Sequence, residues 1–157
     1  MNTETFIQVD LVLHITGFTM MAGIILAELA VNQRVNRYLL TDKARAAGIL
    51  DSAAGFPRLI GIGAALLIVT GIAMLSVFKE SVAGMLWFKI KMVIVLLILI
   101  NGVVVLRRNS NRLQALLEKA DPREDATLLL VKRRLGVALG IELLLFLIVF
   151  FLSIFRF

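Results

Sequence analysis

The sequence predicts an all-α integral membrane protein, a bundle of four transmembrane helices. Three observations support this fold class: 60% of the 157 residues are hydrophobic, the mean hydropathy is +0.95, and the apolar residues gather in four blocks. Soluble domains use a smaller apolar fraction, about 45–50%. A helix needs about 20 apolar residues to cross a hydrocarbon core of about 30 Å, and each block approaches that length.

The four expected spans cover approximately residues 7–30, 58–78, 85–106 and 135–155. The connections between them are of unequal length. Those at 31–57 and 107–134 contain few helix breakers and are expected to extend the neighbouring helices into the cytoplasm. We expect one domain over the whole chain.

Basic residues are concentrated in or beside these two long connections. Thirteen of the 17 Lys and Arg residues lie there: Arg34, Arg37, Lys43, Arg45, Arg58, Arg107, Arg108, Arg112, Lys119, Arg123, Lys132, Arg133 and Arg134. In a four-span chain both connections face the same side, and the positive-inside rule makes that side the cytoplasm. The sequence therefore predicts a multi-pass protein of a bacterial-type inner (plasma) membrane, with both termini outside. Its basic residues are expected to meet anionic lipid headgroups rather than nucleic acid.

The two halves of the chain resemble each other. "NRYLL" at 36–40 resembles "NRLQALL" at 111–117, and "RLIGIGAALLIV" at 58–69 resembles "RLGVALGIELLLFLIV" at 134–149. Both similarities have an offset of about 75 residues. A parallel 2+2 tandem repeat, with its pseudo-twofold axis along the membrane normal, explains the offset. The general likeness of apolar helices is the alternative.

Small residues recur four positions apart in three spans. The pairs are Gly23 and Ala27, Gly61 and Ala65, and Gly136 and Gly140. Such spacing allows close approach of two helix backbones in lipid. The approach is expected either within one chain or between the two copies of a homodimer.

Ionisable residues inside membrane spans usually face the bundle interior and mark a functional site or a structural pair. Near the outer side the sequence has Asp10, His14, Lys89 and Lys91. His14 is the only histidine, and Asp10 lies one helical turn before it on the same face, where it can orient the imidazole. The lysines either join this group or extend towards the outer interface.

A second polar layer is expected near the inner side. It contains Glu28, Arg58, Glu142 and Asn101. Glu142 lies within an apolar span, so it is expected to be either paired, with Arg58 the nearest candidate, or protonated. The layer is interpreted as a structural network or as a proton path. The absence of cysteine excludes disulfides and thiolate metal sites.

Three short motifs carry a family resemblance. "LHITGF" at 13–18, "PRLIGI" at 57–62 and "WFKIKM" at 87–92 resemble the HemJ-type protoporphyrinogen oxidase family and its CopD-like membrane relatives. Those proteins are small helical bundles with a histidine early in the first span and a Trp-x-His-x-Lys-like signature opening the third. His14, Trp87 and Lys91 match these positions.

The resemblance implies a haem- or porphyrin-associated protein. His14 would be the axial metal ligand of haem b, and Lys91, together with Arg58, would pair with the propionates. Lys89 stands where the family has its second histidine. The second axial ligand would therefore be a methionine, water or His14 of a second copy. Whether the chain is an enzyme stays open.

The alternative belongs to another class of protein. It is a non-enzymatic small transporter, channel subunit or membrane scaffold that uses the polar layer of Glu28, Arg58 and Glu142. The repeat, the glycine-rich spans and the two polar layers favour it.

Overall fold

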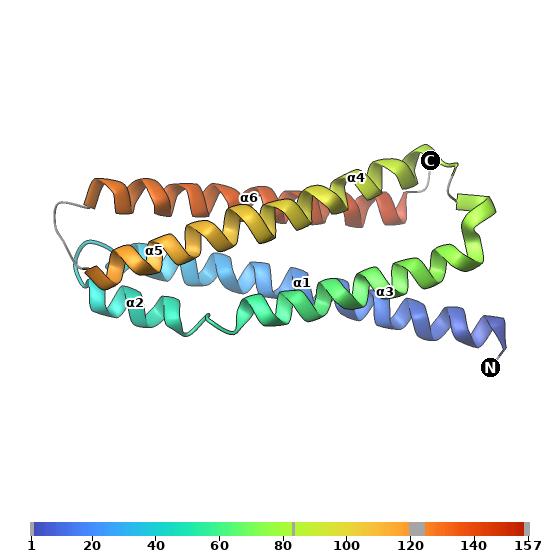
Figure 1. Cartoon of the computed structure of the whole chain (residues 1–157), viewed down its shortest axis with the longest axis horizontal. Helices are drawn as coiled ribbons and strands as arrows, with labels where there is room; N and C mark the ends of the chain where they lie inside the picture. The colour runs from blue at the N-terminus through green and yellow to red at the C-terminus, as the bar shows by residue number, and fades with distance from the viewer. Residues whose placement is uncertain (1, 83, 120–124, 156–157) are drawn as a thin grey trace.

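The computed structural model describes residues 2–82, 84–119 and 125–155, and all regular structure in these ranges is helical. Four long rods lie side by side, and both termini lie at the same end of the bundle (Figure 1). In chain order the elements are α1 (Thr3–Tyr38), α2 (Lys43–Asp51), α3 (Phe56–Val82), α4 (Leu86–Ile100), the π-helical turn η1 (Asn101–Leu106), α5 (Arg107–Lys119) and α6 (Asp125–Ile154).

Four stretches of helix are long and apolar enough to cross a membrane. They are Thr3–Tyr38, Lys43–Phe78, Leu86–Glu118 and Ala126–Ile154. The predicted all-helical fold with four such helices is thus confirmed. The helices also continue beyond the apolar blocks, as expected from the lack of breakers: α1 runs on to Tyr38, and α4, η1 and α5 form one continuous rod.

Local sequence explains where the first long connection turns. The side chain of Asp42 caps α2, because its Oδ1 accepts a hydrogen bond of 2.9 Å from the backbone N–H of Arg45. Pro57 occupies the first turn of α3, where its missing N–H costs nothing. Between these points α2 returns alongside α1 before α3 begins.

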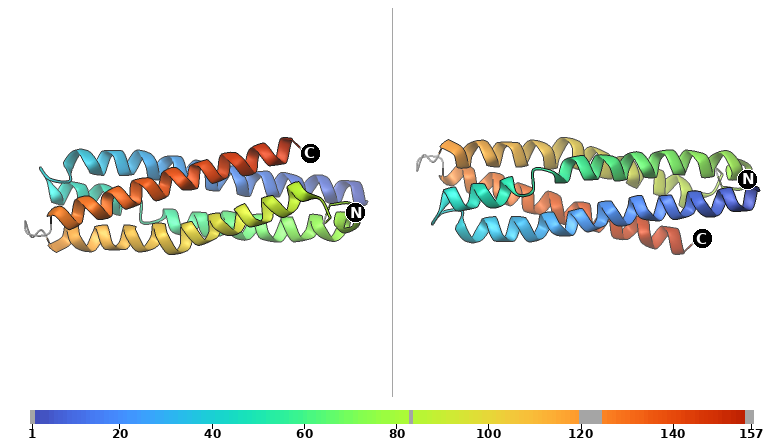
Figure 2. Two further views of the ribbon diagram at one scale, coloured as in Figure 1. Left: turned by 90° about the horizontal axis from the view of Figure 1, so that it is seen from above. Right: turned by 90° about the horizontal axis from the view of Figure 1, so that it is seen from below.

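The arrangement of the helices is uneven along the bundle. α1 packs against α3 and α6, and α6 packs in turn against the rod of α4, η1 and α5. At the end opposite the termini, α2 packs against both α1 and α5 (Figures 1 and 2). In the described part of the chain α3 and α4 make little contact with each other.

Two apolar clusters hold the bundle. The first, here called the leucine cluster, lies at the α2 end and contains Val35, Leu39, Ala46, Leu106, Leu113, Leu117, Leu128, Val131, Leu135, Ala138 and Leu139. The second, the mid-bundle cluster, contains Met21, Ile25, Ile98, Phe146 and Val149. Phe18 extends it through ring contacts with Phe146 and Phe150, at centroid distances of 5.4 and 6.1 Å.

The outer surface of the rods is apolar. Val69 and Ile72 on α3 are each 65% exposed, and Val103 on η1 is 62% exposed. Soluble monomers rarely expose contiguous apolar surface beyond a few hundred Å². The exposed apolar side chains therefore suit a hydrocarbon environment, as the composition predicts.

The closest helix approach occurs at Gly17 of α1 and Gly63 of α3. A Cβ at position 17 would lie 3.0 Å from the Gly63 carbonyl oxygen, and one at position 63 would lie 2.7 Å from Met21 Cγ. Around Gly23, Gly61 and Gly140 a Cβ would meet no described atom within 4 Å. Most glycines of the three small-residue pairs therefore make no close helix contact within this chain. The close approach of α1 and α3 uses a different pair of glycines, Gly17 and Gly63.

Candidate functional site

One face of α1 carries both groups of inward-facing polar residues. Asp10, His14 and Glu28 follow the same spacing of three and four residues as the buried Gly17 and Met21. Residues at this spacing share one side of a helix. The packing of this side against α3 and α6 therefore turns the polar groups into the bundle.

The first group, the His14 cluster, consists of Asp10, His14, Thr70 and Lys91. His14 Nδ1 lies 2.8 Å from Thr70 Oγ1, and that hydroxyl lies 2.6 Å from the Leu66 carbonyl oxygen. The hydroxyl has one proton, and the carbonyl can only accept. Thr70 therefore donates to Leu66 and accepts from Nδ1–H of the imidazole. This tautomer leaves the lone pair on Nε2.

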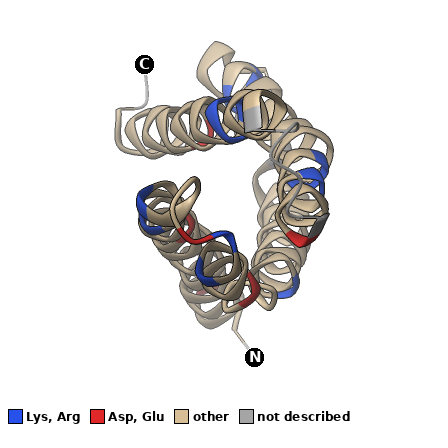
Figure 3. Cartoon of the chain, turned by 90° about the vertical axis from the view of Figure 1, so that its left-hand side faces the viewer, with Lys and Arg blue, Asp and Glu red and all other residues tan. Residues whose placement is uncertain are grey.

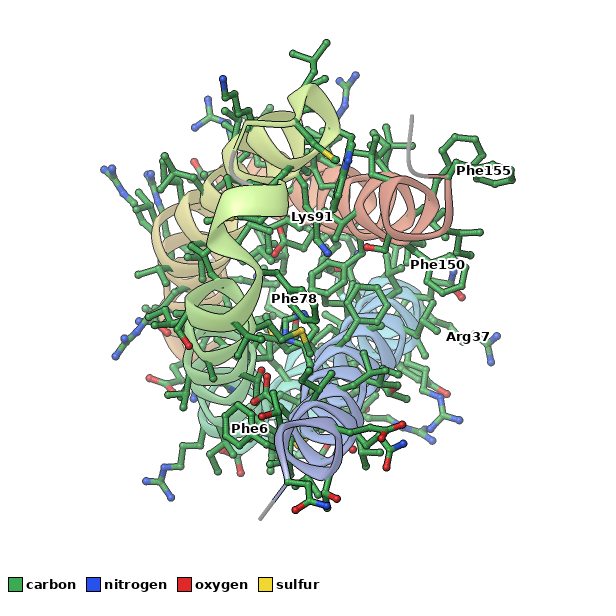
Figure 4. All side chains as sticks on the ribbon, turned by 90° about the vertical axis from the view of Figure 1, so that its right-hand side faces the viewer. Phe6, Arg37, Phe78, Lys91, Phe150 and Phe155 are labelled. Carbon is green, nitrogen blue, oxygen red and sulfur yellow. The ribbon has the colours of Figure 1, made fainter. Side chains whose placement is uncertain are left out.

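Charged groups on both sides of the imidazole complete the His14 cluster. Asp10 and Lys91 both act electrostatically on His14. Asp10 is only 7% exposed, and its Oδ2 is buried without a hydrogen-bond partner among the described residues. Lys91 extends from α4 into the space between the helices (Figure 4). The cluster thus offers a lone pair, a carboxylate oxygen and an ammonium group.

The second group, the Glu142 cluster, consists of Glu28, Asn101 and Glu142. Glu142 on α6 is 3% exposed. Asn101 Nδ2 donates to Glu142 Oε2 at 2.7 Å and to the Ala138 carbonyl oxygen at 3.0 Å, so both of its amide protons are used. Asn101 is the first residue of η1, and π-helical turns occur frequently at functional sites.

A second acid acts on this cluster from α1, because Glu28 acts electrostatically on Glu142 across the α1–α6 contact. One turn further along α1, outside the cluster, Asn32 Oδ1 is buried without a hydrogen-bond partner in the described ranges. Asn32 Nδ2 lies 3.3 Å from the position of a Cβ on Gly136 of α6, so glycine at 136 gives this side chain room. A Cβ at 102 would lie 3.4 Å from Glu142 Oε1, which is ordinary van der Waals contact.

Apolar side chains separate the two clusters. His14 and Glu28 are 14 positions apart on α1, which is a helical rise of about 21 Å. Met21 and Ile25 occupy this interval on the same side of α1, and Phe146 of α6 packs against them. The bundle interior is therefore polar, then apolar, then polar along its length.

The structure brings some of the expected site residues together and leaves others apart. Asp10 and Lys91 both act electrostatically on His14, and Lys89 is exposed. Trp87 is buried where α4 begins, with its Nε1–H donating to Met85 Sδ at 3.0 Å.

Arg58 belongs to neither cluster. It is exposed and contributes to the electrostatics of neither Glu28 nor Glu142. It also precedes Thr70 by 12 positions, a helical rise of about 18 Å, so it is remote from His14. The expected pairing of Glu142 with Arg58 is therefore wrong, and Asn101 takes that place.

Sequence reasoning missed Thr70 and Asn32. Thr70 is a hydroxyl residue within the otherwise apolar block of α3, and it is only 2% exposed. Asn32 lies one turn after Glu28, on the same side of α1. Both residues are polar positions that the sequence shows. An uncharged polar side chain is often tolerated within a span without a partner, so neither Thr70 nor Asn32 was selected as a site residue.

The fold and its interior define an all-helical protein with four helices fit to span a membrane and polar groups enclosed between them. No protein-family model, curated protein or solved structure matches the chain. In the described ranges, no group of three or more His, Cys, Asp or Glu side chains could hold a metal ion.

Proposed function

We propose that this protein carries protons or small monovalent cations across a membrane through the Glu142 cluster. The observation that carries the proposal is the buried carboxyl group of Glu142 on α6, which is 3% exposed and has a second acid, Glu28, acting on it from α1. Ionisable residues within spans mark ion pathways and proton relays.

The chemistry of the carboxylate pair calls for a positive partner. Two neighbouring carboxylates repel when both are ionised, and burial penalises each charge. Arg58 does not compensate them, and Asn101 supplies only neutral amide donors. A proton on Glu142, or a small cation bound beside it, lowers the free energy of the buried group.

The rest of the interior fits a carrier rather than an open pore. The mid-bundle cluster interrupts any polar route between the two ends. In carriers, binding sites inside the membrane are exposed to each side in turn by movement of helices around them. The polar–apolar–polar order along α1 supports that mode of transport.

Reconstituted vesicles test the proposal. Wild-type protein should dissipate an imposed proton, Na⁺ or K⁺ gradient, each followed with its own fluorescent indicator. Glu142→Gln and Glu28→Gln should reduce the flux to the level of protein-free vesicles, because an amide retains the shape but not the charge that binds the cation. Glu118→Gln, at an exposed acid on α5, is the matched control and should leave the flux unchanged.

Folding must be separated from transport in this experiment. Each variant is therefore compared with wild type by circular dichroism and thermal melting in detergent. A wild-type protein that moves none of the three cations, or a well-folded Glu142→Gln that moves them normally, contradicts the proposal.

We also propose the orientation that the charge distribution predicts: both termini outside a bacterial-type inner membrane, and α2 and α5 in the cytoplasm. The tandem duplication stays part of the same proposal: since each half has two spans, both halves start on the same side of the membrane and the repeat is parallel. The basic residues flanking α2 and α5 then lie next to the anionic headgroups of the inner leaflet.

Cysteine labelling tests the orientation. Gly48 on α2 and Gly84 at the other end of the bundle both have open space where a side chain would stand. In intact cells a membrane-impermeant thiol reagent should label Gly84→Cys and should leave Gly48→Cys unmodified until the cells are permeabilised. The chain has no cysteine of its own to interfere. The reverse pattern would invert the proposed topology.

The second candidate function is haem or porphyrin binding at His14, as the family resemblance implies. It is supported by the tautomer, since Nε2 keeps the lone pair that a metal ion needs while Thr70 fixes the ring. The electrostatic action of Lys91 on His14 supports a role for Lys91 in pairing with a propionate of haem b, whereas the remote Arg58 does not fit that role. Within one copy of the chain, His14 would supply one axial ligand to the haem iron. A second histidine would come from another copy of the chain in a homodimer.

An absorption spectrum distinguishes this candidate from the first. Addition of haemin to the purified protein should shift the Soret band in wild type and in Lys89→Ala, and the shift should be lost in His14→Ala. A spectrum that stays that of free haemin, or a shift that His14→Ala retains, eliminates the candidate without affecting the transport assay.

A further inference from the structure

We infer that the groove between the α5 rod and α6 is a binding site for an anionic phospholipid. The groove has a volume of about 730 Å³. Its lining residues belong to η1, α5 and the first half of α6. The end of α5 and the start of α6 lie opposite the termini in Figure 1 and face the viewer in Figure 3. The inference does not depend on the proposed transport, since it rests on the arginines of the groove and not on Glu28 or Glu142.

The charge of the groove indicates an anionic occupant. Four arginines line it, Arg108 and Arg112 from α5 and Arg133 and Arg134 from α6. No acidic side chain is found among its described lining residues. Arg108 and Arg112 are four positions apart on one helix face, where like charges repel. A phosphate between the helices removes this repulsion and accepts charge-assisted hydrogen bonds from the guanidinium groups.

The lining changes from basic to apolar along the groove. Val104 and Val105 of η1 and Val137 and Ile141 of α6 line the part nearer the middle of the bundle. Asn101, which also lines the groove, precedes Arg108 by seven positions, a rise of roughly 10 Å. A phospholipid has the same order of groups, with phosphate at the headgroup level and acyl chains towards the bilayer centre. A soluble anion has no apolar group that could occupy the apolar part of the groove.

Membrane physics supports the choice of lipid over other anions. The positive-inside arrangement brings this end of the bundle to the leaflet surface, and basic pockets between transmembrane helices on that side bind anionic headgroups. Lys132 and Arg133 line a second, smaller cavity beside the groove, with a volume of about 490 Å³. The basic surface therefore continues around α6 at the level of the headgroups.

Lipid titration followed by native mass spectrometry tests the inference on the purified full-length chain. Phosphatidylglycerol should bind and remain bound at a detergent concentration that removes phosphatidylcholine. Arg108→Gln/Arg134→Gln should weaken phosphatidylglycerol binding about tenfold or more, because each basic residue near an anionic lipid contributes about 1 kcal/mol. The matched control is Arg34→Gln/Arg107→Gln. It removes two exposed arginines of the same region that do not line the groove and should change the affinity less than about twofold.

A second variant and a soluble probe identify the source of the phosphate. Val104→Asn/Val137→Asn should weaken phosphatidylglycerol binding while leaving all four arginines in place, because it makes the acyl part of the groove polar. Inorganic phosphate and glycerol phosphate should not displace the lipid at millimolar concentration. Equal binding of phosphatidylglycerol and phosphatidylcholine, equal loss in the control variant, or displacement by soluble phosphate would overturn the inference.

Discussion

Replacement of Gly63 by valine should destabilise the protein strongly, by about 1–3 kcal/mol. The first added carbon would stand 2.7 Å from Met21 Cγ, closer than a Cβ tolerates, and 3.1 Å from the Gly17 carbonyl oxygen, which is a tight contact. The branched side chain would force α3 away from α1 at their closest approach. Thermal melting in detergent measures the effect, and a loss of 1 kcal/mol corresponds to a fall of roughly 2–4 °C in a chain of this size.

A matched control is available two residues away. Gly61 is on the same helix, but a Cβ there meets no described atom within 4 Å. Gly61→Val carries the same change in helix propensity and should leave the melting temperature close to that of wild type. Equal melting temperatures for the two variants would mean that α1 and α3 do not cross at Gly63.

Replacement of Asn101 by leucine should produce the second large loss, about 1–3 kcal/mol. The Glu142 carboxylate would lose the donor that lies 2.7 Å away and would remain buried at 3% exposure. Asn109→Leu is the control, because its Nδ2 bonds only to the Val105 carbonyl of its own helix. This variant should cost much less.

A double-mutant cycle makes the second prediction specific. Asn101→Leu/Glu142→Leu removes both partners together, so no buried carboxylate is left without a donor. Its loss of stability should be smaller than the sum of the two single losses, since residues that share a hydrogen bond are non-additive. Strict additivity would show that Asn101 and Glu142 do not interact in the folded protein.

Hydropathy predicted the four long helices because the length of a span is set by bilayer thickness and by the fixed rise of a helix. For the same reason, depth along the helix could be counted from the sequence. This placed Asp10, His14 and Lys91 near the same end of the bundle, and in the structure the charges of Asp10 and Lys91 act on His14.

Counting depth along each helix does not show which side chains of adjacent helices face one another at that depth. Arg58 and Asn101 were both assigned to the inner layer, but only the rotation of each helix about its own axis decides which one faces Glu142. The same holds for the glycines: their spacing shows that Gly23 and Ala27, or Gly61 and Ala65, share a face, but not towards which neighbour. The crossing at Gly17 and Gly63 depends on the relative rotation of α1 and α3, which hydropathy does not encode.

The leucine cluster has a mechanical consequence. It fastens α1, α2, α5 and α6 to one another at the end away from the termini, with Leu39, Leu113 and Leu128 almost fully enclosed. At the opposite end, α3 leans on α1, and its described residues barely contact α4. The two ends of the bundle are therefore held together differently: the leucine cluster joins four helices at one end, whereas towards the termini α3 is connected to α4 and α6 mainly through α1 and the mid-bundle cluster. A change in the packing of α3 on α1 would therefore alter the position of Thr70 beside His14 before it altered the bond between Asn101 and Glu142.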